Sequence, residues 1–276
     1  SRIAMDIHTA ATRVTTWSGT GSLRNHSRLG IHPEGTREMV QNPVTQIEPG
    51  IASRLSKQRY QLVGSHGGVK VCHWTKESLV NDRSCYKGTF YGIESHSCVQ
   101  ASPTVDQCNL GCVYCWREPH APQLTKVEDD PYELYLESVR GHRRLLTGYG
   151  GNPKADPEKF LEAQNPKHMA ISLNGEPTLY SRLGEFLDIC HQHGTSTFLV
   201  TNGSLPKVIE KLDPLPTQLY VSVDAPNKEI FDRICKPKFD KSAFHKLEQT
   251  LEILPSLDTR TVCRHSLIKG ESLGFH

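Results

Sequence analysis

Residues 108–116 read CNLGCVYCW and carry three thiols, Cys108, Cys112 and Cys115, in a C-x3-C-x2-C spacing with an aromatic residue directly before the third. Thiolate is a soft ligand that suits zinc or an iron–sulfur cluster. A structural zinc site uses four closed ligands, usually in two C-x2-C halves. Three thiols on one short loop favour a cubane cluster with one open iron, which can hold a substrate or cofactor. Three unligated buried cysteines are the least favoured reading of so dense a group.

The composition limits the class of protein. The chain has 276 residues, 32 basic and 30 acidic side chains and a net charge of +2, so the overall charge does not indicate a nucleic-acid binder. Nine cysteines are too few for a disulfide scaffold, and six of them lie between Cys72 and Cys115, which favours metal binding in a reducing compartment. We find no membrane-spanning apolar run and no secretory signal, and we expect a cytoplasmic protein without a membrane partner.

Residues 1–50 differ from the rest of the chain. They are rich in Ser, Thr, Gly and Arg, contain no lysine and show weak apolar periodicity. This composition predicts a poorly ordered or loosely attached extension. Asp6, Glu34, Glu38 and Glu48 weigh against an organellar transit peptide, which is poor in acids. Sequence foreign to the natural domain is a third interpretation.

A second group of cysteines precedes the loop. Cys72, Cys85 and Cys98 follow one another at intervals of thirteen residues. This wide, even spacing is not that of a zinc knuckle, but it suits three short segments that converge on one centre. Three unrelated core cysteines explain the spacing equally well.

Beyond residue 98 the sequence alternates between strand and helix patterns. The expected strands cover residues 99–105, 168–173, 197–201, 218–223 and 259–268. The expected helices cover residues 131–146, residues 183 to near Gly194, and residues 244–254. Such alternation predicts right-handed βαβ units and a parallel sheet, either doubly wound or an open barrel. Ahead of this region, Gly67-Gly68 predicts a turn.

Polar residues follow the expected strands. Glu176, Asn202 and Asp224 come after the second, third and fourth strands, and the cysteine loop comes after the first. Each is a good turn former, and for any single one a turn role explains its presence as well as a functional role does. Because ligands of α/β folds lie at the carboxyl ends of the strands, the whole set together predicts a binding site there.

The cysteine loop resembles the signature of the radical S-adenosylmethionine (radical SAM) superfamily, C-x3-C-x-aromatic-C. Residues 57–270 further resemble the radical SAM enzymes of the wyosine pathway, the tRNA 4-demethylwyosine synthases. The matching stretches are KQRYQ (57–61), CHW (72–74), CYK (85–87), FYGIE (90–94), CVQ (98–100), SLNGEP (172–177), FLVTN (198–202) and QLYVSVDA (218–225). The loop identifies only the superfamily, whereas the thirteen-residue cysteine spacing and QLYVSVD are specific to this family.

The resemblance implies cofactors and their ligands. Cys108, Cys112 and Cys115 would hold a [4Fe–4S] cluster whose open iron binds S-adenosyl-L-methionine. The implied ligands of a second [4Fe–4S] cluster are Cys72, Cys85 and Cys98. The implied residues of the S-adenosylmethionine pocket are Glu176, Asn202, Ser222 and Asp224. Ser222 and Asp224 lie two positions apart and would therefore share one side of a strand.

The resemblance also implies a reaction. N1-methylguanosine in tRNA(Phe) would condense with pyruvate, through a 5′-deoxyadenosyl radical, to form 4-demethylwyosine. Lys87 matches a lysine proposed to form a Schiff base with pyruvate, although an exposed loop lysine is the simpler reading of its position alone. The family further implies an external electron donor of the flavodoxin or ferredoxin type, and we expect a monomer.

The implied fold is a partial (β/α) barrel with an N-terminal cluster-binding extension. We expect residues 51–98 to carry the ligands of the second cluster and residues 99–276 to form the barrel. The family continues beyond Gly270 with further helix–strand units, so the barrel is expected to lack its last strand or strands. Arg264-His265-Ser266-Leu267 stands where the family has an Arg-Leu-Thr-Leu-like run. The short extension ahead of the barrel resembles the archaeal, stand-alone form.

Two groups of basic residues are candidates for contact with RNA, although solvated surface charge explains either group more simply. The candidates are Arg140, Arg143 and Arg144 on one helix, and Lys236, Lys238 and Lys241 in one loop. One alternative function is that of a radical SAM enzyme with an auxiliary cluster and a non-tRNA substrate. Another is that of a zinc-stabilised RNA-binding module without catalysis.

Overall fold

The computed structural model describes residues 45–117 and 121–268. The chain divides into two units, Ser1–Val40 and Gln41–His276, and every described residue belongs to the second. Most of the expected extension, residues 1–44, lies outside the described residues. Its last six residues do not form a loose extension, because the Ile47 side chain is buried beside Ile51 and Leu55.

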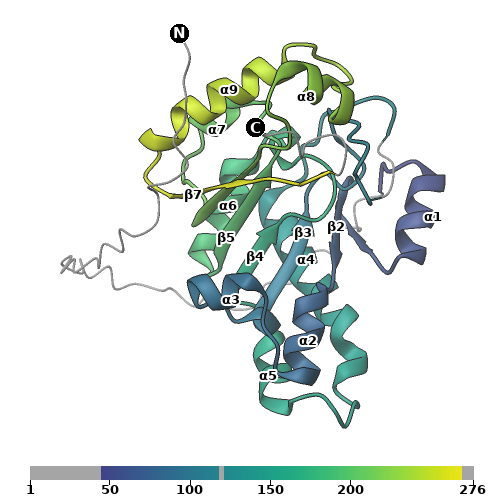
Figure 1. Cartoon of the computed structure of the whole chain (residues 1–276). Helices are drawn as coiled ribbons and strands as arrows, with labels where there is room; N and C mark the ends of the chain where they lie inside the picture. Colours follow the sequence, from purple (N-terminus) through teal and green to yellow (C-terminus); the bar gives the residue numbers. More distant parts are fainter. Residues whose placement is uncertain (1–44, 118–120, 269–276) are drawn as a thin grey trace, which may run out of the picture. The chain divides into compact units, whose positions relative to one another are not determined.

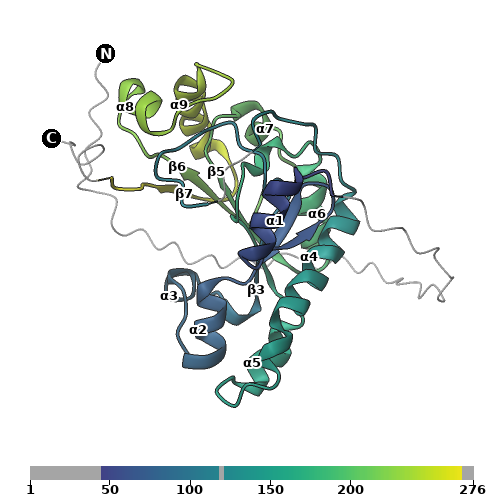
Figure 2. The same cartoon turned by 90° about the vertical axis from the view of Figure 1, so that its right-hand side faces the viewer.

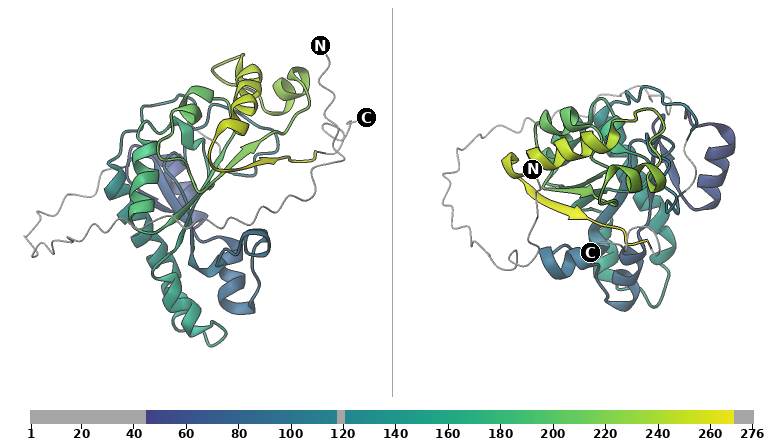
Figure 3. Two further views of the ribbon diagram at one scale, coloured as in Figure 1. Left: turned by 90° about the vertical axis from the view of Figure 1, so that its left-hand side faces the viewer. Right: turned by 45° about the horizontal axis from the view of Figure 1, so that its top comes forward.

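One seven-stranded sheet, in the order β1-β2-β3-β4-β5-β6-β7, runs through the unit (Figure 1). The strands are β1 (Gln61–Val63), β2 (Gly67–Lys70), β3 (Cys98–Ser102), β4 (His168–Ile171), β5 (Ser196–Thr201), β6 (Gln218–Ser222) and β7 (Arg260–Arg264). β3 to β7 pair in parallel, whereas β1, β2 and β3 pair antiparallel. Among the described residues the sheet does not close, and β7 lies at one edge (Figure 3). The predicted α/β fold with an open parallel sheet is confirmed.

Helices connect and cover the strands. The α-helices are α1 (Pro49–Lys57), α2 (His73–Asn81), α3 (Tyr86–Tyr91), α4 (Pro131–Leu146), α5 (Pro157–Ala163), α6 (Leu183–Gln192), α7 (Pro206–Glu210), α8 (Lys228–Ile234) and α9 (Ala243–Ile253). Short 3-10 turns are η1 (Ser95–Ser97), η2 (Thr147–Tyr149), η3 (Pro177–Leu179) and η4 (Leu254–Ser256). α2 and α3 lie towards one end of the sheet, and α8 and α9 towards the other (Figure 2).

Local sequence sets where α4 begins. Asp130 caps α4, because its carboxylate accepts hydrogen bonds from the backbone N–H groups of Tyr132 and Glu133 at 3.0 and 3.1 Å. Pro131 follows in the first turn, where a missing N–H costs nothing. The predicted bounds of this helix, residues 131–146, are confirmed.

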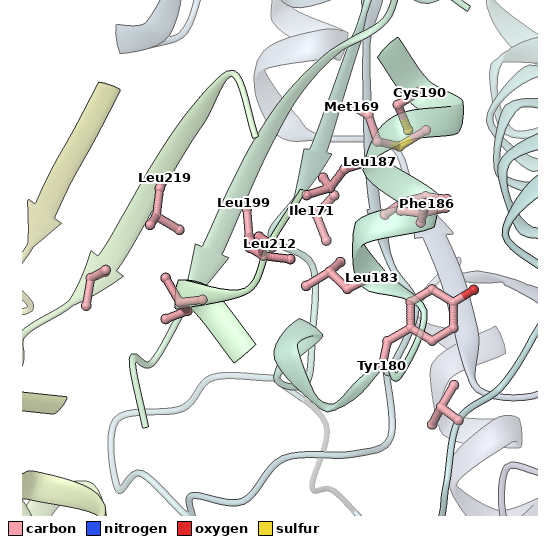
Figure 4. Packing of buried hydrophobic residues seen from close by; sticks show 14 of the residues in the cluster. Met169, Ile171, Tyr180, Leu183, Phe186, Leu187, Cys190, Leu199, Leu212 and Leu219 are labelled. Carbon is pink, nitrogen blue, oxygen red and sulfur yellow. The ribbon is translucent and has the colours of Figure 1, made fainter. Parts of the chain in front are cut away.

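The two faces of the parallel strands differ in what they contact. Met169, Ile171, Leu199 and Leu219 point to one face, where they form the main core with α6 (Figure 4). Because side chains alternate along a strand, the residues between them point to the other face. We call that face the inner face; its buried cluster consists of Ala170, Phe198 and Tyr220, with Cys98, Val200 and Val262 packed against it.

The turn predicted at Gly67-Gly68 is wrong by three residues. The chain turns at residues 64–66, and both glycines pair within β2. Gly64 has a φ of +58°, which suits glycine in a tight turn. A Cβ at Gly67 would lie 2.6 Å from the Val63 carbonyl oxygen, so this glycine allows close packing within the hairpin.

Strand ends differ slightly from the predictions. β3 ends at Ser102 instead of residue 105, and β7 spans five residues instead of the expected 259–268. The sheet also continues across the boundary expected between residues 98 and 99, because β2 pairs with β3. The division into residues 51–98 and 99–276 stays a prediction about which segment carries which cluster.

Candidate active site

A cavity of about 480 Å³ opens at the carboxyl ends of the parallel strands. The residues predicted to bind the first cluster and S-adenosylmethionine all line it: Cys108, Cys112, Cys115, Glu176, Asn202, Ser222 and Asp224. The structure therefore brings together side chains from the cysteine loop and from the ends of β4, β5 and β6. The side chains predicted for the site thus lie together at this edge of the sheet.

The cysteine loop rests on the segment that joins α8 to α9. Backbone N–H groups of Gly111 and Val113 donate to carbonyls of residues 234–236 at 2.8 to 3.0 Å. In return, the Lys238 N–H donates to the Asn109 carbonyl at 3.0 Å. The loop conformation is thus fixed by backbone hydrogen bonds, and its side chains remain available to the cavity.

Glu176 is buried and fully engaged within the protein. Its Oε1 accepts from the Thr178 N–H at 3.1 Å and from the hydroxyls of Thr178 and Thr201, each at 2.6 Å. Its Oε2 accepts from the Asn202 N–H at 2.8 Å. Burial raises the pKa of this carboxyl, and the four donors partly offset that effect. Glu176 therefore joins the ends of β4 and β5, in addition to lining the cavity.

Asn202 connects the end of β5 to the cysteine loop. Its Nδ2 donates to Asn109 Oδ1 at 2.8 Å, and its Oδ1 accepts from the Ser204 N–H at 2.9 Å. Asn109 Nδ2 in turn donates to the Ser204 hydroxyl at 2.7 Å. Both side-chain atoms of Asn202 are in use, so its first role in this geometry is to position the loop.

Asp224 holds the other end of the same loop. Its Oδ2 accepts from the Tyr114 hydroxyl at 2.7 Å, and its Oδ1 accepts from the Ser266 N–H at 2.7 Å. The Ser222 hydroxyl, two residues before Asp224, accepts a hydrogen bond from Arg264 Nη2 at 3.3 Å. The sequence predicted the positions of these strand-end residues. It did not reveal their hydrogen-bond partners in the cysteine loop and at or after the end of β7.

The thiols of the loop have environments that fit metal ligation. Burial, reinforced by Glu176, raises the pKa of Cys108 to about 12, so a metal is needed to hold this buried thiol as thiolate. A hydrogen bond from Cys235 is the main cause that lowers the pKa of Cys112. Cys115 is exposed. Soft thiolates on one side of a cavity fit an iron–sulfur cluster with an open iron.

The earlier cysteines also converge. Cys72 and Cys85 are the residues that precede α2 and α3, and Cys98 begins β3. The Ser95 hydroxyl lies 3.0 Å from the Cys85 N–H and 3.4 Å from its sulfur. Burial raises the pKa of Cys98 to about 12, Lys87 lowers it, and charge on Cys72 and Cys85 would raise it further.

Neither trio of thiols is compact enough for a single ion. A tetrahedral zinc with Zn–S bonds of about 2.3 Å would hold its sulfurs about 4 Å apart. Among the residues that the structure describes, the one group of three metal-binding side chains with all ligand atoms within 4.8 Å is Glu94, His96 and Glu162. Wider spacing suits a cubane, in which each thiol binds a different iron.

The Glu94 group is better explained by ion pairs. His96 Nε2 lies 2.5 Å from Glu162 Oε2, and Lys167 Nζ lies 2.7 Å from Glu94 Oε2. Glu94 and Glu162 therefore each already have a basic partner in the protein. We assign no metal to this group.

Lys87 lies on the first turn of α3 and reaches over the inner face of the sheet. Its Nζ lies 4.7 Å from the ring centroid of Phe198 and 5.6 Å from that of Tyr220. Val200, two residues after Phe198 on the same face, lines the cavity. Lys87 thus lies between the second trio of thiols and the cavity, not in an exposed loop.

Several residues of the cavity wall were not predicted. Trp116 is 77% exposed at the cavity, and the Arg117 guanidinium lies 3.8 Å from its ring centroid. Arg264 also lines the cavity, and its position at the end of a strand was a usable signal. The partners Tyr114 and Cys235 had no comparable signal, because their roles depend on contacts between distant segments.

The two basic groups proposed for RNA lie in different places. Lys236 and Lys238 are exposed in the segment that supports the cysteine loop. The three arginines lie on α4, which packs against β1, β2 and α6. Arg143 is tied to the end of α5, since its Nη2 donates to Asn165 Oδ1 at 3.1 Å.

An open parallel sheet with a three-thiol loop at the end of its first parallel strand is the architecture of a radical SAM enzyme. The model of the Radical SAM superfamily matches residues 102–274. The chain is an enzyme of this superfamily, whose members use a [4Fe–4S] cluster and S-adenosylmethionine. Within the described residues, no helix is both long enough and apolar enough to cross a bilayer.

Similarity to known proteins identifies the family within this superfamily. An S-adenosyl-L-methionine-dependent tRNA 4-demethylwyosine synthase of Pyrococcus abyssi is 44% identical over 229 residues, which cover 81% of this chain and 67% of the relative. The synthase TYW1 of Mus musculus is 41% identical, over 86% of this chain and 34% of the relative. A solved structure of TYW1 with a lysine–pyruvate adduct bound matches with a TM-score of 0.76 at 42% identity, covering 82% of this chain and 74% of that one. The chain belongs to the tRNA 4-demethylwyosine synthase family.

Proposed function

We propose that this chain condenses N1-methylguanosine in tRNA(Phe) with pyruvate to form 4-demethylwyosine. The observation that carries the proposal is the position of Lys87, whose ammonium lies on the inner face between the second trio of thiols and the cavity. A related TYW1, 42% identical, has been solved with a lysine–pyruvate adduct bound. Relatives named for a tRNA product supply the class of the second substrate.

Lys87 would bind pyruvate covalently. The neutral amine attacks the carbonyl carbon, the nitrogen–carbon double bond forms, and the carbonyl oxygen leaves as water. The half-buried position of Lys87 against two aromatic rings keeps this step away from bulk solvent.

Cys72, Cys85 and Cys98 would hold a second [4Fe–4S] cluster whose open iron binds pyruvate beside Lys87. Cys72 and Cys85 precede the amino ends of α2 and α3, where the backbone dipoles of the helices favour nearby negative charge. Lys87, two residues after Cys85, places a positive charge near the same centre. These features support a site for an anionic cluster and an anionic substrate.

Glu176, Asn202, Ser222 and Asp224 would form the pocket for S-adenosylmethionine next to the first cluster. When both are bound, the first cluster and S-adenosylmethionine would supply a 5′-deoxyadenosyl radical that removes hydrogen from the N-methyl group of the tRNA base. The protein residues hold the cysteine loop, shield the cavity and position the methyl group near Lys87. We propose that the electron comes from an external flavodoxin or ferredoxin, and that the chain acts as a monomer in the cytoplasm.

The decisive assay is product formation. The reconstituted chain is incubated with S-adenosylmethionine, dithionite, pyruvate and tRNA(Phe) that carries N1-methylguanosine, and nucleosides are analysed by mass spectrometry. We expect 4-demethylwyosine with methylated tRNA and none with unmodified tRNA or with Cys115→Ala. Release of 5′-deoxyadenosine without any change to the tRNA would instead indicate a radical SAM enzyme for another substrate.

The second cluster has a separate test. Iron and acid-labile sulfide are measured per chain after anaerobic reconstitution, in the parent and in the Cys72→Ala/Cys85→Ala/Cys98→Ala variant. About eight irons in the parent and about four in the variant are expected for two cubane clusters. About four in both would exclude the second cluster and with it the iron-bound pyruvate.

A further inference from the structure

Two polar side chains on β6 are buried without a hydrogen bond of standard geometry. Gln218 and Tyr220 are each 1% exposed. Neither polar atom of the Gln218 carboxamide makes a hydrogen bond, and the Tyr220 hydroxyl makes none of standard geometry, with the Tyr86 hydroxyl as its neighbour. Buried amide and hydroxyl groups normally have partners, because leaving one unpaired costs stability. Two such groups two residues apart on one strand indicate a site that a ligand completes.

Both side chains face the Lys87 ammonium. Gln218 pairs with Phe198 in the parallel register between β5 and β6, so the two side chains lie next to each other on the inner face. Lys87 Nζ lies over Phe198 and over the ring of Tyr220. Within the described residues, this ammonium forms no ion pair with an acidic side chain. A free cation and two polar groups that lack a standard hydrogen bond therefore meet on one patch of the sheet.

The chemistry of this patch fits a small anion with an apolar end. A carboxamide N–H and a phenol O–H both donate hydrogen bonds, and burial raises the pKa of Tyr220, so its proton stays in place. Ala170 and Phe198 provide the apolar surface beside them. Ala170 pairs with Phe198 in register, so the two apolar side chains lie side by side next to Gln218.

We propose that Gln218 and Tyr220 bind the carboxylate of the 2-oxo acid held at Lys87, and that they select a 2-oxo acid over a simple ketone. This inference rests on the proposed function of Lys87. The donors of Gln218 and Tyr220 are uncharged, so the positive charge next to the carboxylate comes from Lys87. The methyl group contacts Ala170 and the Phe198 ring.

The neighbouring cation Arg260 has another role. It pairs with Gln218 in register on β7, but its guanidinium is stacked 4.8 Å from the ring centroid of Tyr91. Arg260 is exposed, whereas Gln218 and Tyr220 are buried. The buried pair therefore lies deeper than the arginine.

The test traps the lysine adduct directly. The reconstituted enzyme is titrated with pyruvate or with acetone in the presence of cyanoborohydride, and the modified Lys87 peptide is quantified by mass spectrometry. We expect Tyr220→Phe and Gln218→Met to raise the half-saturating pyruvate concentration by about tenfold to a hundredfold, the range of a hydrogen bond to a charged group. Labelling by acetone, which lacks the carboxylate, should change by less than about twofold.

Stability separates this role from a structural one. Because the Gln218 carboxamide has no partner in the protein, Gln218→Met should leave the melting temperature unchanged or higher, and Tyr220→Phe, which removes at most a weak contact with the Tyr86 hydroxyl, should lower it little. Tyr180→Phe is the matched control, since the buried Tyr180 hydroxyl donates to the Asp129 carbonyl at 2.6 Å, far along the chain from this patch. It should lower the melting temperature and leave pyruvate trapping unchanged.

The outcomes are distinct. Unchanged half-saturation by pyruvate in both variants overturns the inference while the proposed function stands. No adduct in the parent enzyme overturns the proposed role of Lys87 and this inference with it. Gln218→Glu adds a further check. Its carboxylate should repel the pyruvate carboxylate, so Gln218→Glu should raise the half-saturating pyruvate concentration more than Gln218→Met does.

Discussion

At the scale of single residues, Glu176 illustrates how a strand-end carboxylate both lines a site and builds it. Two backbone N–H groups donate to its two oxygens, from Thr178 to Oε1 and from Asn202 to Oε2. In Glu176→Gln, either orientation of the amide sets an NH2 group against one of these N–H donors. We expect a loss of about 2 to 3 kcal/mol in the free energy of unfolding and weaker binding of S-adenosylmethionine.

Denaturant unfolding and equilibrium dialysis with S-adenosylmethionine measure the two effects. The control is Glu185→Gln, because the exposed Glu185 contacts Arg182 on the surface and should contribute less than about 1 kcal/mol. A Glu176→Gln variant as stable as that control would contradict the assigned role.

His142 makes a residue-scale prediction about pH. It is fully buried on α4 without a hydrogen-bond partner, and burial lowers its pKa from 6.5 to about 4. The unfolded chain therefore binds a proton at a higher pH than the folded chain does. This contribution to stability is complete above about pH 6.5 and is lost as the pH falls towards 4. Between pH 7.5 and 5.5 we expect a loss of about 1 kcal/mol from this group.

Unfolding of the parent and of His142→Leu is measured at both pH values. Leu cannot titrate, so the difference between the two pH values should shrink by about 1 kcal/mol in the variant. An equal difference in both proteins would show that the buried imidazole does not control acid stability.

At the scale of elements, the turn after β4 depends on a glycine that supports the cysteine loop. Gly175 has a φ of +76°, and a Cβ there would lie 1.7 Å from the Thr104 carbonyl oxygen. Gly194, after α6, has a similar φ of +69° but open space around it. Gly194→Ala should cost about 1 kcal/mol for the backbone conformation alone. Gly175→Ala should cost at least about 3 kcal/mol, because the backbone of residues 104–107 must also move.

The measurement is thermal unfolding of both variants, together with iron content after reconstitution. Gly175→Ala should retain less iron than Gly194→Ala, because displacement of Thr104 shifts the start of the cysteine loop. Similar stabilities and similar iron contents in the two variants would contradict the assigned role of this turn.

Elements also show what sequence reasoning can reach. α4 was predictable with its bounds because its cap, its proline and its apolar spacing are all local. α3 was not, because it has six residues and buries none of them. The strand-end positions of Glu176, Asn202 and Asp224 followed from the parallel alternation. Their hydrogen-bond partners did not, because those depend on how distant segments meet.

The same limit applies to Lys87. The place of Lys87 two residues after Cys85, and its match to a family, were visible in the sequence. Its position over Phe198 depends on how α3 packs across the sheet. Gln218 gave no signal at all, since a glutamine that begins a strand is ordinary until its burial and its missing partners are known. Packing across the sheet, rather than local pattern, determines which residues meet the substrate.

At the scale of the whole molecule, the net charge of +2 is too small to explain RNA binding, so the placement of the basic residues decides it. Lys236 and Lys238 lie in the segment that supports the cysteine loop, beside the cavity. Arg140 and Arg144 lie on α4, which packs against the antiparallel strands and α6. An anticodon loop that delivers a base to the cavity would bring its phosphates near the lysines and away from these arginines.

We therefore expect Lys236→Gln/Lys238→Gln to weaken binding of methylated tRNA and to lower the slope of log K against log salt concentration by about 2, since each lost phosphate contact removes about one unit or slightly less. The matched variant Arg140→Gln/Arg144→Gln removes the same charge, and its slope should equal that of the parent. Binding is measured by filter retention at several salt concentrations. Equal slopes for the two double variants would mean that overall charge, rather than the loop beside the cavity, governs the contact. A lower slope for the arginine variant alone would place the tRNA on α4.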